Sequence, residues 1–393
     1  MARSSWPARL LIPALAAPLM LAGALAGPWQ ATASAAVCQG WTYGQPPSPG
    51  TADNELNGVT VLSACDAWAV GTTRSSGVSQ TLIEHWDGSS WTVVPSPSPG
   101  TTGNGLASVN AVSPSNVWAV GAFSASAADQ TLILHWDGTS WAQVPSPSPG
   151  SSFSELAAVR AVSASDAWAV GDYSSAAGGG NKTLILHWNG TTWAHVPSPN
   201  PATFNNLTGV TATSASNAWA VGEIGTSLGD RTLTLHWNGT TWARVPSPNP
   251  GLGDDLTGVA AASASNAWAV GFSIVGAAAN ASQTAQALVL HWNGSTWTSV
   301  AVPPPAPGSS TLLNGVTATS TASVWAAGIS ETTTTEQGLI LRWNGTAWKQ
   351  VPAPSPGTVT TLSAVAATSA TSAWAVGRFS TTIVGQALAV HCC

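Results

Sequence analysis

Residues 207–246 have the sequence LTGVTATSASNAWAVGEIGTSLGDRTLTLHWNGTTWARVP, and this stretch predicts the whole repeating element of the fold. Apolar and small polar residues alternate over 207–214, and Ala215-Ser216-Asn217 is typical of a turn. Further strands are expected over 218–223, 232–237 and 240–246. Asn238-Gly239 joins the last two and predicts a two-residue hairpin with a type I′ turn. The stretch therefore predicts four short antiparallel strands and no helix.

The same unit recurs seven times, at intervals of about 50 residues. Each unit carries Trp-Ala-Val-Gly, with Trp-Ala-Ala-Gly as a variant at Trp325, and the first six continue with a His/Arg-Trp-(Asn/Asp)-Gly-x-x-Trp motif and a proline-rich exit. Four strands repeated seven times predict an all-β, seven-bladed β-propeller, in which neighbouring blades cover the faces that one blade alone leaves exposed. An open β-solenoid and a string of sandwiches are the alternatives.

The two ends of the chain complement each other. The last unit stops at His391-Cys392-Cys393, where the other units continue into the hairpin and a fourth strand. The N-terminal segment from Cys38 to Gly50 holds a fourth strand without the first three. Joined in that order, the two ends fill the same seven positions that run from His85 to Trp91 in the first unit. We therefore expect the N-terminal strand, over 41–49, to complete the last blade and close a ring.

The four cysteines agree with this closure. Cys38 and Cys393 fall on the two hairpin-turn positions of the composite blade, so their Cα atoms are expected within disulfide reach. This predicts a Cys38–Cys393 bridge and, by elimination, a pairing of Cys65 with Cys392. Pairing of Cys38 with Cys392 or with Cys65 is an alternative, because four cysteines allow three connectivities, and a set of free thiols is another.

The N-terminus has the features of a secretory signal peptide. Arg3 and Arg9 precede an apolar stretch over 10–27, and Ala33-Ser34-Ala35 fits a cleavage site. We expect a signal peptide over 1–35, a propeller over 36–393 and a secreted, extracellular protein, with a membrane anchor as the alternative. No later segment is apolar over enough residues to cross a membrane.

The charge balance restricts the classes of partner. The chain has 10 Lys and Arg against 16 Asp and Glu, and only 7% of its residues are charged. A chain without a basic surface is not expected to bind nucleic acid. The scarcity of acids also argues against acid–base catalysis. We expect a monomer with no catalytic residues, no metal and no cofactor.

The recurring aromatic and polar residues are expected to be structural, because a core element must recur in every blade whereas a ligand site need not. Trp136 and Trp141 are assigned to packing between blades, as diagonal neighbours on one face, with a stacking platform for sugars as the alternative. Asp66 and Asp166 alternate with asparagines in other units, which indicates turn caps. Six histidines share one repeat position on the third strand, too far from the axis to share an ion, and are expected to pack on or bond to a neighbouring blade. They are His85, His135, His187, His236, His291 and His391.

The loop between the second and third strands differs in every unit, whereas the other turns hardly vary. If the protein binds a ligand, this face offers different chemistry in each blade. Inert spacers are the alternative. Asp254-Asp255 is an isolated acidic pair after a Pro-Gly linker, for which a calcium site is the alternative to a structural role. The candidate ligand-binding residues are Arg74, Asp172, Tyr173, Glu223, Phe272 and Arg378.

These motifs resemble the β-propeller repeats of secreted bacterial proteins over nearly all of the span from Trp41 to Cys393. They are more distantly similar to tectonin-type lectin propellers, which share a Trp-Ala-Val strand followed by Gly-x-x-Trp, and to kelch and galactose-oxidase propellers. The kelch double glycine is absent. Tyr43 and Tyr173 occupy unrelated repeat positions, so the copper-ligating tyrosines of galactose oxidase are not matched. The resemblance implies the propeller fold and favours binding over catalysis.

We therefore expect a secreted, non-catalytic binding module. Its expected ligand is a glycan or another extracellular surface component, such as a protein, bound at the face that carries the variable loops. A propeller enzyme of the hydrolase or oxidase class and a structural cell-surface protein are the alternatives.

Overall fold

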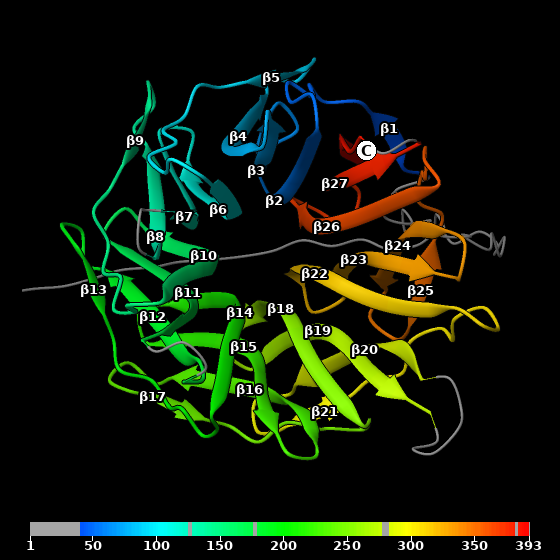
Figure 1. The fold of residues 1–393 in the computed structure, drawn as a ribbon. Helices are drawn as coiled ribbons and strands as arrows, with labels where there is room; N and C mark the ends of the chain where they lie inside the picture. Colours follow the sequence, from blue (N-terminus) through cyan, green and yellow to red (C-terminus); the bar gives the residue numbers. More distant parts are fainter. Residues whose placement is uncertain (1–39, 125–127, 176–178, 277–282, 382–383, 393) are drawn as a thin grey trace, which may run out of the picture. The chain divides into compact units, whose positions relative to one another are not determined.

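The computed structural model describes residues 40–124, 128–175, 179–276, 283–381 and 384–392. The chain divides into two compact units, Met1–Ala36 and Val37–Cys393, and all described strands belong to the second. The strands form seven four-stranded antiparallel blades around a central axis (Figure 1), which confirms the predicted all-β propeller with seven blades. Single parallel bridges join blade 2 to blade 3 and blade 6 to blade 7. No helix among the described residues has the length and apolar character that spanning a membrane requires.

The twenty-eight strands fall into blades in chain order, except that the N-terminal strand belongs to the last blade. Blades 1 to 3 contain β2 (Asp53–Ser63), β3 (Asp66–Ser75), β4 (Val78–Trp86) and β5 (Trp91–Val93); β6 (Asn104–Ser113), β7 (Asn116–Ser124), β8 (Asp129–Trp136) and β9 (Trp141–Gln143); and β10 (Phe153–Ser163), β11 (Asp166–Ser174), β12 (Lys182–Trp188) and β13 (Trp193–His195). Blades 4 and 5 contain β14 (Phe204–Ser214), β15 (Asn217–Thr226), β16 (Gly229–Trp237) and β17 (Trp242–Arg244); and β18 (Gly253–Ser263), β19 (Asn266–Val275), β20 (Thr284–Trp292) and β21 (Trp297–Ser299). Blades 6 and 7 contain β22 (Ser310–Ser320), β23 (Ser323–Glu331), β24 (Glu336–Trp343) and β25 (Trp348–Val351); and β26 (Val359–Ala367), β27 (Ala373–Ser380), β28 (Gln386–Cys392) and β1 (Thr42–Gly44).

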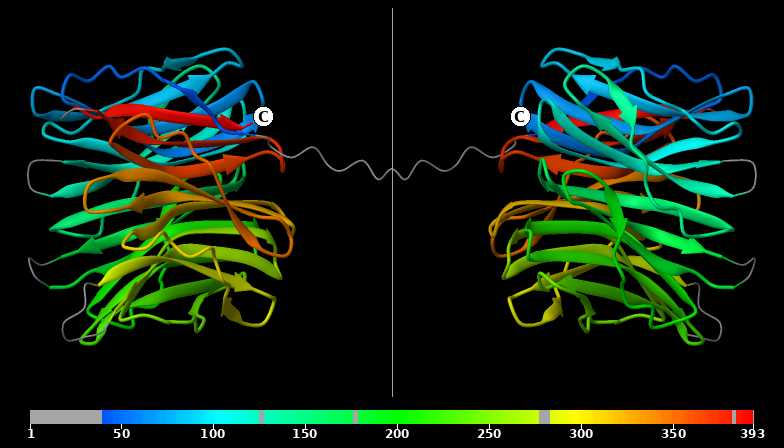
Figure 2. Two further views of the ribbon diagram at one scale, coloured as in Figure 1. Left: turned by 90° about the vertical axis from the view of Figure 1, so that its right-hand side faces the viewer. Right: turned by 90° about the vertical axis from the view of Figure 1, so that its left-hand side faces the viewer.

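The first strand of each blade lies at the central axis and the fourth at the periphery (Figure 1). Side views show that the strands run between two opposite faces of the unit (Figure 2). We call the face with the connections between second and third strands the loop face, and the opposite one the turn face. The first strand bulges where it pairs with the glycine of Trp-Ala-Val-Gly, for example between Leu156 and Ala158. A Cβ atom on Gly171 would lie 2.0 Å from the Glu155 carbonyl oxygen, so this approach requires glycine.

The hairpin between the third and fourth strands differs from the expected type I′ turn. Trp136 pairs directly with Trp141 rather than with Thr139, so the connection has four residues and the two tryptophans are direct cross-strand partners, not diagonal ones. Asp137 Oδ1 accepts hydrogen bonds from the backbone N–H groups of Thr139 and Ser140, at 2.8 and 2.9 Å. The predicted turn was wrong because this side-chain cap replaces the backbone geometry of a tight turn, and only Gly138 has a positive φ, of 98°.

Strand lengths also differ from the prediction at both ends of a blade. In blade 4 the three inner strands extend further toward the loop face than expected. β14 begins at Phe204, β15 ends at Thr226 and β16 begins at Gly229. The fourth strand covers only Trp242–Arg244 instead of 240–246, because the two residues before it belong to the hairpin cap.

Tryptophans join each blade to the next, as predicted for inter-blade packing. The ring of Trp118 in blade 2 lies 5.0 Å from that of Trp188 and 5.3 Å from that of Trp193, both in blade 3. Trp118 is 1% exposed. The same triplet recurs at the other interfaces except that of blades 6 and 7, where Cys392 replaces one tryptophan and, of the described tryptophans, Trp325 contacts Trp41 alone. Burial of such large aromatic surfaces in edge-to-face contacts stabilises the blade interfaces.

Five of the six repeated histidines bond within their own blade and not to a neighbouring one, and the Nε2 atom of the sixth, His391, has no hydrogen-bond partner among the described residues. The His135 ring lies 4.2 Å from the Trp118 ring, and its Nε2 atom lies 3.1 Å from Asn116 Oδ1. The turn residues predicted as caps are thus the histidines' hydrogen-bond partners. The Arg342 guanidinium takes the histidine's place in blade 6, 4.9 Å from the centroid of the Trp325 ring.

The N-terminal strand completes blade 7 in the predicted register. Thr42 pairs with His391, as Thr92 pairs with His85 in blade 1. The Trp41 ring packs 5.5 Å from that of Trp325 in blade 6. The two chain ends are therefore held in one sheet.

The expected pairing of Cys65 with Cys392 was wrong. Cys65 is an exposed, free thiol on the turn face of blade 1. Cys392 is buried in the cluster that includes Trp325 of blade 6, on the far side of blade 7 from Cys65, and it is not without a partner. Cys38, Cys393 and the signal peptide expected over 1–35 lie outside the described residues, so the Cys38–Cys393 bridge stays a prediction.

One core position departs from the repeat. Glu84 in β4 is fully buried, where other blades carry leucine or valine. It pairs with Ala69, which belongs to the cluster shared by blades 1 and 7 with Trp374 and Val376, so its side chain faces the interface at which the ring closes. Neither carboxyl oxygen has a hydrogen-bond partner among the described residues, and burial raises the pKa of Glu84 to about 8.

Candidate functional site

Two concentric sets of residues surround the central axis at the loop face. The inner ring lies on the first strands, and each of its residues pairs with an outer-ring residue on the second strand of its own blade. The inner ring comprises Glu55, Gly105, Glu155, Asn206, Asp255, Leu312 and Thr361. The outer ring comprises Thr72, Ala122, Asp172, Glu223, Phe272, Ile329 and Arg378. All seven outer-ring residues differ in type, although the Trp-Ala-Val-Gly or Trp-Ala-Ala-Gly motif precedes each one directly.

Four of the six predicted ligand-binding residues occupy the outer ring: Asp172, Glu223, Phe272 and Arg378. The structure thus gathers them at one repeat position of four blades. Arg74 lies two residues beyond the ring, exposed, with its Nε donating to Ser79 Oγ at 3.1 Å. Tyr173 lies on the opposite face of β11 from Asp172, where it packs on the core and makes an edge-to-face contact with His195, with 6.1 Å between the ring centroids.

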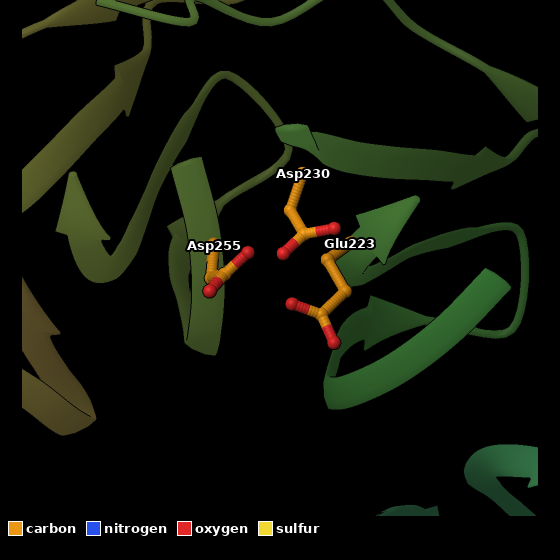
Figure 3. A group of neighbouring side chains, drawn as sticks. All are labelled: Glu223, Asp230 and Asp255. Atoms are coloured by element: carbon orange, nitrogen blue, oxygen red, sulfur yellow. The ribbon is translucent and has the colours of Figure 1, made fainter. Parts of the chain in front are cut away.

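Three carboxyl groups converge between blades 4 and 5 (Figure 3). Glu223 comes from β15, Asp230 from β16 and Asp255 from β18. One oxygen atom of each lies within 4.8 Å of those of the other two, and within the described chain this is the group of His, Cys, Asp and Glu side chains close enough to hold a metal ion. An all-carboxylate set matches the oxygen ligands that Ca²⁺ and Mg²⁺ prefer. We call these three residues the acidic cluster.

Electrostatic repulsion and burial perturb the acidic cluster. Burial, together with the close approach of Glu223 and then of Asp230 and Asp254, raises the pKa of Asp255 well above its ordinary value. Asp255 Oδ1 is buried without a hydrogen-bond partner among the described residues. At neutral pH, Asp255 therefore retains a proton that an isolated aspartate would lose.

The negative surface continues into blade 3. Burial and the neighbouring Glu155 raise the pKa of Asp172 to about 7, while the hydrogen bond from Asn181 Nδ2 to Asp172 Oδ2, 2.7 Å long, opposes this shift. Burial and the Asp129 carboxylate raise the pKa of Glu155. Together these groups form an acidic arc over blades 2 to 5.

Asp254 does not belong to this arc, although it precedes Asp255. It is fully buried, accepts hydrogen bonds from Ser273 Oγ and the Gly251 N–H group, and lies 3.4 Å from Arg231 Nη1. In blades 1 and 2, Asn54 Oδ1 and Asn104 Oδ1 likewise accept hydrogen bonds from the N–H groups of Gly50 and Gly100. Asp254 is therefore the structural cap of its linker, and only Asp255 of this pair joins the acidic cluster.

On the opposite side of the loop face, two arginines lie among acidic residues, which are Asp53 and Glu55 in blade 1 and Glu331 and Glu336 in blade 6. Arg378 Nη1 lies 3.6 Å from Asp53 Oδ2 across the junction of blades 7 and 1. These two residues and Arg74 line a cavity of about 370 Å³. A second cavity of about 370 Å³, between blades 1 and 3, is lined by Glu55, Arg74 and Glu155. The loop face is thus hollowed, and the arginines of blades 7 and 1 that line its cavities are accompanied by acids.

Sequence analysis missed Glu155, Asp230 and the partnership of Asp255 with Glu223. Glu223 and Asp255 lie 32 positions apart in the sequence and in different blades, so no local spacing connects them. Alignment of the seven units offers the one available signal: residue type changes in every unit at the position after the conserved glycine.

Comparison with solved structures identifies the same architecture. YCF48 from Cyanidioschyzon merolae superposes with a TM-score of 0.54 at 15% identity, over 90% of this chain and 98% of that chain. YCF48 bound to a D1 peptide gives a TM-score of 0.54 at 14% identity, over 90% and 94%. A GH74 xyloglucanase from Xanthomonas campestris gives 0.54 at 13% identity, over 87% of this chain and 54% of that one. The likeness shows the propeller fold.

No protein-family model and no curated protein matches the sequence.

Proposed function

We propose that this chain is a secreted binding module that recognises a glycan at the loop face. The observation that carries the proposal is the contrast between the two faces. Inward from the turn face, the tryptophan contacts between blades and the stacking of histidine on tryptophan recur with few exceptions, which are Arg342 in blade 6 and Cys392 in blade 7, whereas the outer ring holds seven different residues. A ligand without seven-fold symmetry requires different contact residues in different blades, and the outer ring provides them.

The chemistry around the acidic cluster supports a sugar ligand. Phe272 pairs with Asp255 across two strands and is only partly buried, so an aromatic face lies beside the carboxyl groups of Asp255 and Glu223. Sugar rings present apolar C–H faces and several hydroxyl groups, which such a combination of aromatic and hydrogen-bonding groups can contact together. YCF48 with a D1 peptide and the GH74 xyloglucanase are examples of a peptide-bound and a glycan-active protein with this fold.

The test is a glycan array probed with the purified chain, followed by calorimetric titration of the glycans that bind. We expect Phe272→Ala and Asp255→Asn to weaken binding by about ten-fold or more, because each removes a direct contact. Asp87→Asn is the matched control: it also removes one carboxylate, but on the turn face, where other blades carry asparagine. Absence of any bound glycan, or equal affinity in all four proteins, would contradict the proposal.

A glycan-cleaving enzyme is the second candidate. It is favoured by Asp255, which retains a proton at neutral pH, next to the Glu223 carboxyl group, since glycosidases use a protonated and an ionised carboxyl group as a pair. Release of reducing ends from a bound glycan, lost in Glu223→Gln, would favour this candidate over binding alone.

A further inference from the structure

A cationic side chain lies in the central channel, away from the acidic arc. The first strands of all seven blades line a cavity of about 260 Å³ there, and one residue of each blade occupies an equivalent position. These residues are Thr60, Asn110, Arg160, Thr211, Ala260, Thr317 and Ala366. Arg160 is the charged residue of this lining, and the adjacent channel cavity, of about 210 Å³, is lined by uncharged residues.

Arg160 has no counter-charge in the described part of the chain. It makes no ion pair or hydrogen bond there, and its Nε atom is buried without a partner. Burial lowers the pKa of the guanidinium, which is nevertheless ionised at neutral pH. Glu155, in the same strand, lies five residues away, which corresponds to roughly 16 Å and exceeds the screening length at physiological salt. The acidic arc therefore does not neutralise Arg160.

Hydrogen-bond donors accompany this cation. The hydroxyl groups of Thr60, Thr211 and Thr317 line the same cavity and make no hydrogen bond among the described residues. Asn110 Oδ1 accepts the Ala161 N–H group at 2.9 Å, and Asn110 Nδ2 makes no hydrogen bond among the described residues. The cavity has room for roughly eight water molecules at about 30 Å³ each, so a small solute with part of its hydration shell fits.

We infer that the channel is a binding site for a small oxyanion, with Arg160 as its anchor. Arg160 is partly buried with its Nε atom fully covered, and a partly desolvated charge without a partner is unfavourable until a counter-ion or a ligand compensates it. A guanidinium presents two parallel N–H groups that match the two oxygens of a carboxylate or of a phosphate, and nearby hydroxyls donate to the remaining oxygens. The site is separate from the loop-face surface proposed for glycans and requires no part of it.

The experiment titrates sodium phosphate and, separately, sodium acetate into the purified chain in a dilute Tris buffer, with calorimetry as the readout. We expect one bound anion per chain and an affinity that falls as sodium chloride is added. Binding of phosphate alone identifies a phosphate-type oxyanion, and binding of acetate alone identifies a carboxylate group. Binding of both supports the shared oxyanion chemistry.

Arg160→Thr is the decisive variant, because threonine occupies the equivalent position in blades 1, 4 and 6 and the fold accommodates it there. It is expected to lose at least about ten-fold in anion affinity, as loss of a charge-assisted bidentate contact implies. Arg244→Gln is the matched control, an exposed arginine on the outer strand of blade 4 at a position where blades 2 and 6 carry glutamine. It is expected to bind like the parent chain. Arg160→Lys keeps the positive charge but lacks the two parallel N–H donors of the guanidinium, and it is expected to bind the anion with intermediate affinity.

Two results would overturn the inference. One is the absence of binding by either anion to the parent chain. The other is unchanged affinity in Arg160→Thr, whose folding is checked by circular dichroism and by its melting temperature.

Discussion

One buried residue, Glu84, is expected to make the stability of the whole ring depend on pH. Its carboxyl group lies in the interface between blades 1 and 7 without a hydrogen-bond partner among the described residues. In the other blades this position is leucine or valine. The carboxyl group is tolerated there in its neutral form, because an isolated carboxylate in an apolar interface is far more costly than a carboxylic acid.

Stability is therefore expected to decrease as the pH rises. The pKa of Glu84 is raised from 4.5 to about 8, so between these values the folded chain holds a proton that the unfolded chain has lost. The contribution of Glu84 to the free energy of unfolding falls through this window, by on the order of 4–5 kcal/mol in total, and is constant above it. Urea unfolding at pH 5 and pH 9 measures the effect.

Glu84→Gln is the control for this prediction, since it keeps the shape of the side chain and cannot ionise. Its stability is expected to change much less over the same pH range than that of the parent chain, and Glu84→Leu is expected to be more stable than either at pH 9. If the parent chain and Glu84→Gln lose the same stability between pH 5 and pH 9, the assignment is wrong.

Some residues of the candidate site can be predicted from the sequence, and others cannot. Loops of variable sequence follow Asp172, Glu223, Phe272 and Arg378, and this variation predicts them as site residues. The sequence places Asp255 only beside its neighbour Asp254, which the structure shows to be a cap. The acidic cluster depends on contacts between blades, and sequence separation carries no information on such contacts.

At the level of elements, the hairpin between the third and fourth strands depends on one glycine. Gly138 has a φ of 98°, and a Cβ atom there would lie 2.9 Å from Ser115 Cβ in the turn between the first two strands. Gly138→Ala is expected to destabilise the fold by about 1–3 kcal/mol through backbone strain and this contact. The midpoint of urea unfolding tests this value.

Gly253→Ala provides the comparison, because a Cβ atom on Gly253 would meet no atom closer than 3.5 Å. Its stability is expected to stay within about 0.5 kcal/mol of that of the parent chain. Equal losses in the two variants would show that the hairpin geometry is not the cause.

Element order, blade number and the composite last blade were all predictable, because they follow from hydrophobic alternation and from the counting of motifs. The hairpin type and the partner of the histidines were not. Asn-Gly is compatible both with a type I′ turn and with a cap in which the Asn oxygen accepts the N–H groups two and three residues later, and the dipeptide alone does not distinguish them. The histidine position is visible in the sequence, but its stacking on Trp118 or an equivalent tryptophan depends on strand register.

For the molecule as a whole, the N-terminal strand is expected to be indispensable. Trp41, Thr42 and Gly44 cover the outer edge of β28, and Ser48 Oγ accepts the Ala387 N–H group. A chain that begins at residue 51 exposes this edge and the Trp325 ring. We expect it to unfold at a temperature at least about 10 °C lower, or without a cooperative transition.

The control for this truncation is the chain that begins at residue 36, which keeps every described contact of β1. Thermal unfolding followed by circular dichroism compares the two. An unchanged melting temperature in the shorter chain would show that β1 does not contribute to the closure.

The pairing of β1 with β28 also has a consequence for biosynthesis. β1 and β28 are separated by about 340 residues, so β1 cannot pair until β28 has been synthesised. At about 5–20 residues per second, the interval between the two strands lasts roughly 17–68 s. During that interval the six complete blades emerge in succession with an unpaired edge at the growing end, and synthesis of β28 ends this exposure.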